Sequence, residues 1–140
     1  MKNHYGKVLA VASLMAILGT APSLAQITDT LRVKVPFEFV VGDQKLSAGE
    51  YSFIRLGGVL RIQAPYGQTG MIVATNHAER KQNDHGGRLV FTRYGDTHFL
   101  TEVWSPANTP GQRLRKSPLE IELAQRAPRP DVASVAIQSR

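Results

Sequence analysis

Residues 31–41 read LRVKVPFEFVV, and apolar side chains occupy every second position along this segment. An alternation with a period of two places the apolar residues on one face of a β-strand. The charged side chains of Arg32, Lys34 and Glu38 fall on the opposite face. Pro36 also falls there, and because it has no amide hydrogen it suits an edge strand or a bulge. The segment therefore predicts one long strand whose apolar face covers a core.

Two tight hairpins are predicted from two-residue loops that tolerate a positive φ angle. Such a loop sets the register, so the second hairpin should place Val90 opposite Thr101 and Arg93 opposite His98. A further short, buried strand is expected at Met71–Thr75. The predicted hairpins are Tyr51–Leu56 with Val59–Ala64 around Gly57-Gly58, and Leu89–Tyr94 with Thr97–Trp104 around Gly95-Asp96.

A short helix is predicted near residues 118–126. Ser117 can cap this helix by accepting a hydrogen bond from the amide of Glu120, which is a typical start signal. The apolar residues between 119 and 123 also alternate, and this leaves a strand as the alternative. The segment 127–140 contains prolines and has no strong period, so we expect it to be a flexible basic tail, with pairing of Val132, Val135 and Ile137 to another element as the alternative.

The N-terminal residues 1–25 have the parts of a secretory signal peptide. Lys2 and Lys7 give a positive start, Val8–Leu18 is an uncharged apolar run, and small residues precede the expected cleavage point. This run is shorter than the ~20 apolar residues that cross a membrane, so no stable membrane span is expected after cleavage. The sequence thus predicts an exported protein, periplasmic or secreted, with a single β-rich domain over residues 26–126.

The chain has 140 residues and no cysteine. That length suits one small domain, and without disulfides its stability must come from burial and backbone pairing. Short strands, tight turns and one helix predict an all-β fold. We expect a small antiparallel meander that forms a barrel or a sandwich of about six or seven strands, with one short C-terminal helix.

The charge distribution excludes some partners. The formal net charge is +6, from 17 basic and 11 acidic residues, and the excess lies in the leader and near the C-terminus. The body shows no basic stripe with neighbouring aromatic residues, so nucleic-acid binding is not expected. Arginine and lysine also interrupt the faces of the predicted strands, which are too few and too short for an outer-membrane barrel with an apolar face towards lipid on every strand.

Three blocks stand out in the chain after residue 25. They are VPFEFVVG (35–42) with LSAGEY (46–51), LVFTRYGD (89–96) with Phe99-Leu100 and Val103-Trp104, and Lys116-Ser117 leading into residues 120–124. In these blocks the chain resembles a family of small, exported, β-rich proteins of soil bacteria that has no assigned activity. The resemblance implies export and a helical last block, and it brings no catalytic residue to this sequence.

Familiar catalytic motifs are absent from the sequence. It contains neither a G-x-S-x-G nucleophile elbow nor a phosphate-binding P-loop. His77 and Glu79 share a face of an expected strand, His85 lies in the loop beyond, and imidazole and carboxylate groups bind zinc or copper. Because their spacing matches no ligand motif, we predict no metal or other cofactor and keep these three residues as the candidates for one.

Amphipathic aromatic side chains often line binding grooves, although they also suit a core or its rim. Tyr66 falls in a predicted turn after Ala64. Tyr51, Tyr94 and Trp104 lie on predicted strands, and Trp104 ends its strand just before a proline-containing loop. We take Tyr51, Tyr94 and Trp104 as the candidates for a pocket.

These observations favour an exported, non-enzymatic β-domain with a binding or structural role in the bacterial envelope. Its partner would be an envelope or extracellular molecule, or a small apolar ligand. The alternative is a metal-binding protein or a metal-assisted enzyme that uses His77, Glu79 and His85.

Overall fold

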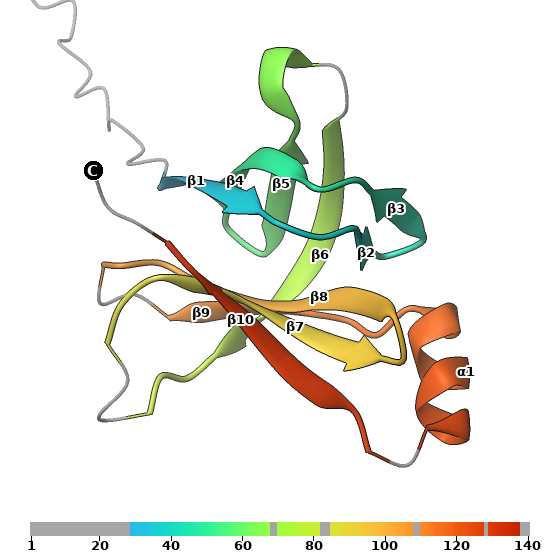
Figure 1. Ribbon diagram of the computed structural model, residues 1–140. Coiled ribbons are helices and arrows are strands. Elements are labelled where there is room, and N and C mark those ends of the chain that lie inside the picture. The colour runs from blue at the N-terminus through green and yellow to red at the C-terminus, as the bar shows by residue number, and fades with distance from the viewer. Residues whose placement is uncertain (1–28, 68–69, 82–84, 108–109, 128, 138–140) are drawn as a thin grey trace, which may run out of the picture.

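The computed structural model describes residues 29–67, 70–81, 85–107, 110–127 and 129–137. In this part of the chain the fold is all-β with one short helix, as the sequence predicts (Figure 1). The predicted signal peptide lies outside the described residues. The elements are β1 (Thr30–Val35), β2 (Phe39–Val41), β3 (Gln44–Leu46), β4 (Gly49–Leu56), β5 (Val59–Gln63), a helical turn (Pro65–Gly67), β6 (Gly70–Ala78), β7 (Arg88–Tyr94), β8 (Thr97–Trp104), β9 (Gly111–Leu114), α1 (Pro118–Arg126) and β10 (Asp131–Ala136).

The strands form two layers that share one strand. The first layer has the order β1-β4-β5-β6, with antiparallel neighbours, and it includes the predicted hairpin at Gly57-Gly58. Only Gly70–Ala74 of β6 pairs with β5, because Thr75–Ala78 pairs instead with β9 of the second layer. Figure 1 shows β6 running from the upper layer to the lower one. A strand that switches sheets in this way turns a corner of the fold.

The second layer is built around β8. One edge of β8 pairs with β7, as predicted for the hairpin at Gly95-Asp96, and β10 continues the sheet beyond β7. The other edge pairs with β2 at His98 and Phe99, and with β9 at Glu102 and Val103. The described strand pairs are all antiparallel, as expected, except for β2 with β8. Among the described pairings the sheet does not close, and its free edges are β1, β3 and β10.

The prediction of one long strand over residues 31–41 is wrong in one respect, because the strand is interrupted at Pro36. Strand β1 ends at Val35 and pairs with β4, whereas β2 begins at Phe39 and pairs with β3 and β8. Proline cannot donate to a strand ladder, so the break falls where pairing would fail. The apolar residues on both sides of Pro36 still enter one core, and the segment therefore crosses from one layer to the other.

The expected register of the second hairpin holds near its turn and then changes. Arg93 lies opposite His98, as predicted, but Val90 lies opposite Glu102 rather than Thr101. A bulge next to Phe91 adds one residue to β8, and the Thr101 hydroxyl donates a 3.0 Å hydrogen bond to the Val90 carbonyl. The bulge moves Val103 and Trp104 onto their observed partners in β7.

The C-terminal segment differs from the expected flexible tail. Residues 131–136 form β10, which pairs with β7 along its whole length. Ala133, Val135 and Ile137 pack against the core, and Asp131 forms a 2.6 Å ion pair with Arg93. Alternating small apolar residues suffice here because the edge of β7 supplies the hydrogen-bond partners. Local sequence pattern does not identify β7 as this partner, because β7 and β10 are far apart in the chain.

The helix occurs where it is predicted, over Pro118–Arg126. The Ser117 hydroxyl accepts a 3.2 Å hydrogen bond from the Glu120 amide, which confirms the cap. Leu123 and Ala124 of α1 pack on a small cluster of Val40, Tyr94 and Phe99, separate from the main core between the layers. Within the described residues, no helix is long and apolar enough to cross a membrane.

Candidate functional site

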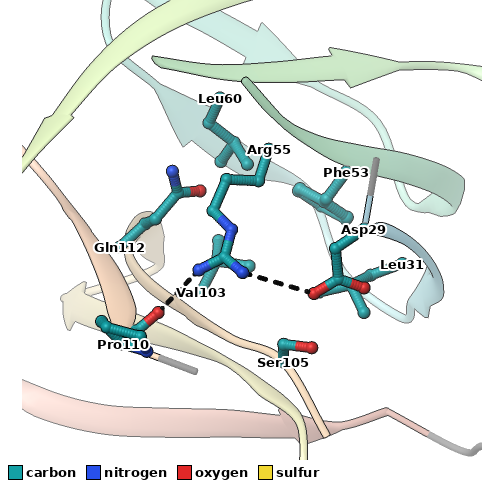
Figure 2. Close-up of a pocket in the computed structure, with 9 residues that line it drawn as sticks. All are labelled: Asp29, Leu31, Phe53, Arg55, Leu60, Val103, Ser105, Pro110 and Gln112. Atoms are coloured by element: carbon teal, nitrogen blue, oxygen red, sulfur yellow. Dashed lines mark hydrogen bonds and ion pairs between the residues drawn. The ribbon is translucent and has the colours of Figure 1, made fainter. Parts of the chain in front are cut away.

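A small cavity lies between the two layers, beside the side chain of Arg55 (Figure 2). Its volume of about 10 Å³ holds one water molecule at most. The cavity is therefore a packing gap at the seam between the layers, too small for an apolar ligand. Its lining residues are Asp29, Leu31, Phe53, Arg55, Leu60, Val103, Ser105, Pro110 and Gln112.

Polar contacts close this seam. Arg55 on β4 donates a 3.0 Å hydrogen bond to the carbonyl of Pro110, and its guanidinium lies 3.8 Å from the carboxylate of Asp29 (Figure 2). Gln112 on β9 is 4% exposed and donates to the carbonyl of Gly57 in the β4–β5 turn. These contacts tie the first layer to the second, so the polar groups at the cavity have a structural role.

A much larger hollow lies on the first layer. We call it the outer-face basin, and its volume is about 550 Å³. Its side chains alternate with core residues on the same strands, so the basin occupies the face turned away from the core. Arg32, Ser52 and Gln63 form one row across β1, β4 and β5. The basin is lined by Arg32, Glu50, Ser52, Gln63, Ala64, Pro65 and Tyr66.

Tyr66 is an unusual residue at the end of the basin. The residue is 98% exposed, and its backbone has φ +64° and ψ +16°, in the left-handed region. This conformation costs an L-residue about 1–2 kcal/mol, whereas glycine adopts it freely. Because the ring is not buried, packing does not offset the cost. The choice of tyrosine at this position is therefore unexplained by the fold.

The polar groups of the basin can form many hydrogen bonds. The guanidinium of Arg32 donates, the carboxylate of Glu50 accepts, and the amide of Gln63 does both. Ser52 adds a hydroxyl that also donates and accepts. Arg32 and Glu50 are the two charged residues of the lining, and the exposed Lys34 lies opposite Glu50 on β1.

The pocket candidates Tyr51 and Tyr94 are buried, each 6% exposed, at separate places. The Tyr51 hydroxyl donates to the carbonyl of Ser47 at 2.7 Å, and its ring meets Phe39 edge to face. The Tyr94 ring meets Phe99 edge to face in the cluster beneath α1. Neither tyrosine lines the cavity at the seam or the outer-face basin.

Trp104, the third pocket candidate, is also buried, at 4% exposed. The guanidinium carbons of Arg80 and Arg88 lie 5.2 and 5.5 Å from its ring centroid, within cation–π range. Its indole nitrogen donates to Glu102 at 2.9 Å. An added Cβ at Gly111 would come within 2.6 Å of the ring, so the glycine allows β9 to lie close against Trp104. Trp104 thus anchors the end of β8.

The candidate metal ligands do not form a cluster. His77 lies on β6 opposite Gln112 and is exposed. Glu79 and His85 are exposed beyond the end of β6 and before β7. In the described ranges, no group of three or more histidine, aspartate or glutamate side chains is placed to hold a metal ion.

In the part of the chain that the structure describes, the pKa values of two ionisable side chains, His98 and Glu120, are shifted. Burial lowers the pKa of His98, the charge of Arg93 lowers it further, and Asp96 raises it; the imidazole stacks on Phe37 at 4.1 Å. Burial raises the pKa of Glu120, and Lys116 acts in the opposite direction. Glu120 is 3% exposed and its Oε1 has no hydrogen-bond partner.

No family model, curated protein or solved structure matches the chain. The candidate site rests on the geometry of the chain's own residues. Tyr66 is one of the amphipathic aromatic residues that the sequence offers for a groove, but it falls in a predicted turn and is not among the three predicted pocket residues. The available signal was a bulky aromatic residue between Pro65 and Gly67, next to strands whose outward positions are polar.

Proposed function

We propose that the protein is an exported, non-enzymatic binding domain that acts in the cell envelope or outside the cell, and that the outer-face basin is its binding surface. The difference in volume between the internal cavity and the outer-face basin supports this proposal most. The cavity at the seam between the layers holds one water molecule at most, whereas the basin has the size of an ordinary ligand site, ~300–1,000 Å³. Binding on the outside therefore replaces the small apolar ligand inside a barrel as the preferred version of the proposal.

The basin residues favour binding over catalysis. Glu50 is the basin's carboxylate, and the lining brings no histidine or second acid near it to complete an acid–base pair. Tyr66 extends from the surface and offers a contact rather than a reactive group. A partner held by such a surface is recognised through shape and hydrogen bonds.

The test is capture of envelope material from the native host on immobilised mature protein. Wild type is compared with the double variant Tyr66→Ala/Arg32→Ala and with the control Ile72→Ala. Ile72 is 60% exposed on β6 and does not line the basin. We expect a bound component that the double variant loses and the control retains. Equal capture by all three proteins would refute the basin as the binding surface.

Export and the absence of catalysis are tested separately. Fractionation of the native host should recover the protein, without residues 1–25, in the periplasm or the medium. Recovery of the full-length chain in the cytoplasm would contradict export. The purified protein should show no turnover in broad hydrolase screens, and a turnover abolished by His77→Ala or His85→Ala would establish the metal-assisted alternative instead.

A further inference from the structure

We infer that the outer-face basin binds an uncharged carbohydrate, with Tyr66 as the platform for a sugar ring. This inference rests on the proposed function and names the class of ligand for the same surface. Three features of the basin carry it: an exposed aromatic ring held at a backbone cost, a row of polar side chains, and a lining without a basic cluster.

The first feature is the Tyr66 ring. Nearly all of its surface is open, although it lines the edge of the basin. One face of a pyranose ring consists of C–H groups, and such faces stack on aromatic rings, whose electron-rich faces attract the slightly positive hydrogens. An exposed tyrosine kept in a left-handed conformation is explained if a ligand covers the ring.

The second feature is the hydrogen-bonding row beside that ring. Arg32, Ser52 and Gln63 lie side by side across three strands, and Glu50 flanks the row on β4. Sugar hydroxyls donate and accept at the same oxygen, so they are best matched by a surface that presents donors and acceptors close together. The basin does this on a rigid sheet, which limits the entropy lost on binding.

The third feature separates carbohydrate from other ligands. The lining carries one arginine and one glutamate rather than a cluster of basic side chains, which disfavours nucleic acid and polyphosphate. Strand β4 is paired on both sides, with β1 and β5, so a peptide could add a strand only at the free edge of β1 and not across the basin itself. The lining also has no deep apolar pocket for a peptide side chain. An uncharged oligosaccharide meets each of these conditions.

The experiment measures binding of three defined probes, cellohexaose, chitohexaose and xylohexaose, to the folded mature protein by titration calorimetry. At least one probe should bind, and Tyr66→Ala should weaken its binding about tenfold or more, as expected when a stacking platform is lost. Tyr66→Phe keeps the ring and should stay within about threefold of wild type. The control Ile72→Ala should bind as wild type, and all variants should give the wild-type circular dichroism spectrum.

Salt dependence gives a second readout. Binding of an uncharged oligosaccharide should not change between low and high sodium chloride, whereas an anionic ligand is released by salt. Heparin and polyphosphate serve as the anionic probes. Tighter binding of either one, lost at high salt, would overturn the carbohydrate inference in favour of an anionic ligand.

The outcomes also separate this inference from the proposed function. If no oligosaccharide binds at millimolar concentration while capture of envelope material still depends on Tyr66 and Arg32, the ligand class is wrong and the binding surface stands. If capture is also independent of both residues, both proposals fail. Equal weakening by Ile72→Ala and Tyr66→Ala would likewise overturn the role assigned to the Tyr66 ring.

Discussion

Tyr66 shows how one side chain can oppose the stability of its own turn. Its left-handed backbone costs free energy that no buried contact returns. Natural proteins keep such residues mainly where the side chain has a use outside the fold. We therefore expect that a glycine at this position raises the stability of the protein and weakens its binding.

Tyr66→Gly should raise the free energy of unfolding by about 0.5–1 kcal/mol, because glycine removes strain of about 1–2 kcal/mol and returns part of that gain as unfolded-chain entropy. Urea unfolding followed by circular dichroism measures the change. The same variant should lose the ligand of the basin. Tyr66→Ala keeps the backbone strain and should leave stability unchanged, so a gain of equal size in both variants would contradict the explanation.

Glu120 predicts an unusual dependence on pH. Its folded-state pKa is raised by burial, so the protein gains stability from this residue below the ordinary glutamate pKa of about 4.3 and loses it as pH rises through the folded pKa. Glu120→Gln should therefore be more stable than wild type at pH 7 and equal to it below about pH 4.

Unfolding in urea at both pH values tests the prediction for Glu120. Glu122→Gln is the matched control on the same helix, since Glu122 is exposed and pairs with Arg126 at 2.6 Å. An exposed pair of this kind contributes only about 0.3–0.5 kcal/mol. A loss of stability at pH 7 in Glu120→Gln larger than that in the control would show that the buried carboxylate is stabilising.

At the level of single elements, the packing of β10 can be tested by substitutions on its two faces. Val135→Asp should lower the free energy of unfolding by about 1–3 kcal/mol, because it turns a charge towards the core side of the strand. Val132 is 71% exposed on the other face, and Val132→Asp should change stability by less than about 0.5 kcal/mol. Equal effects of the two substitutions in thermal unfolding would mean that the segment does not pack as a strand.

Local sequence pattern predicted the elements whose partners are close in the chain. Both hairpins and the capped helix follow from turn residues and from Ser117, which act within a few positions. The break at Pro36, the bulge at Thr101 and the strand β10 depend on distant partners. Pattern alone carries no information about such partners, and this is why those three features were missed.

The candidate site was harder to predict than the fold for a related reason. The basin is formed by outward residues of β1, β4 and β5, and outward polar residues look alike in a sequence until their register is known. The predicted pocket residues Tyr51, Tyr94 and Trp104 lie on strands, and all three are buried in the fold. Position outside the core, rather than residue type, distinguishes Tyr66.

For the whole molecule, the seam between the layers should contribute measurably to stability. Arg55→Met removes the hydrogen bond to Pro110 and the partner of Asp29, while it keeps most of the apolar stem. We expect a loss of about 1 kcal/mol, since the groups are partly exposed. Arg61→Met, on the exposed face of β5, is the control, and a similar loss there in urea unfolding would contradict a specific role for the seam.

The course of β6 has a further consequence for the intact protein. Gly70–Ala74 pairs with β5 in one layer and Thr75–Ala78 pairs with β9 in the other, so the backbone of one strand forms hydrogen bonds in both layers. Loosening either layer frees part of the same strand and weakens its neighbour. We therefore expect the two layers to unfold together, in one all-or-none transition.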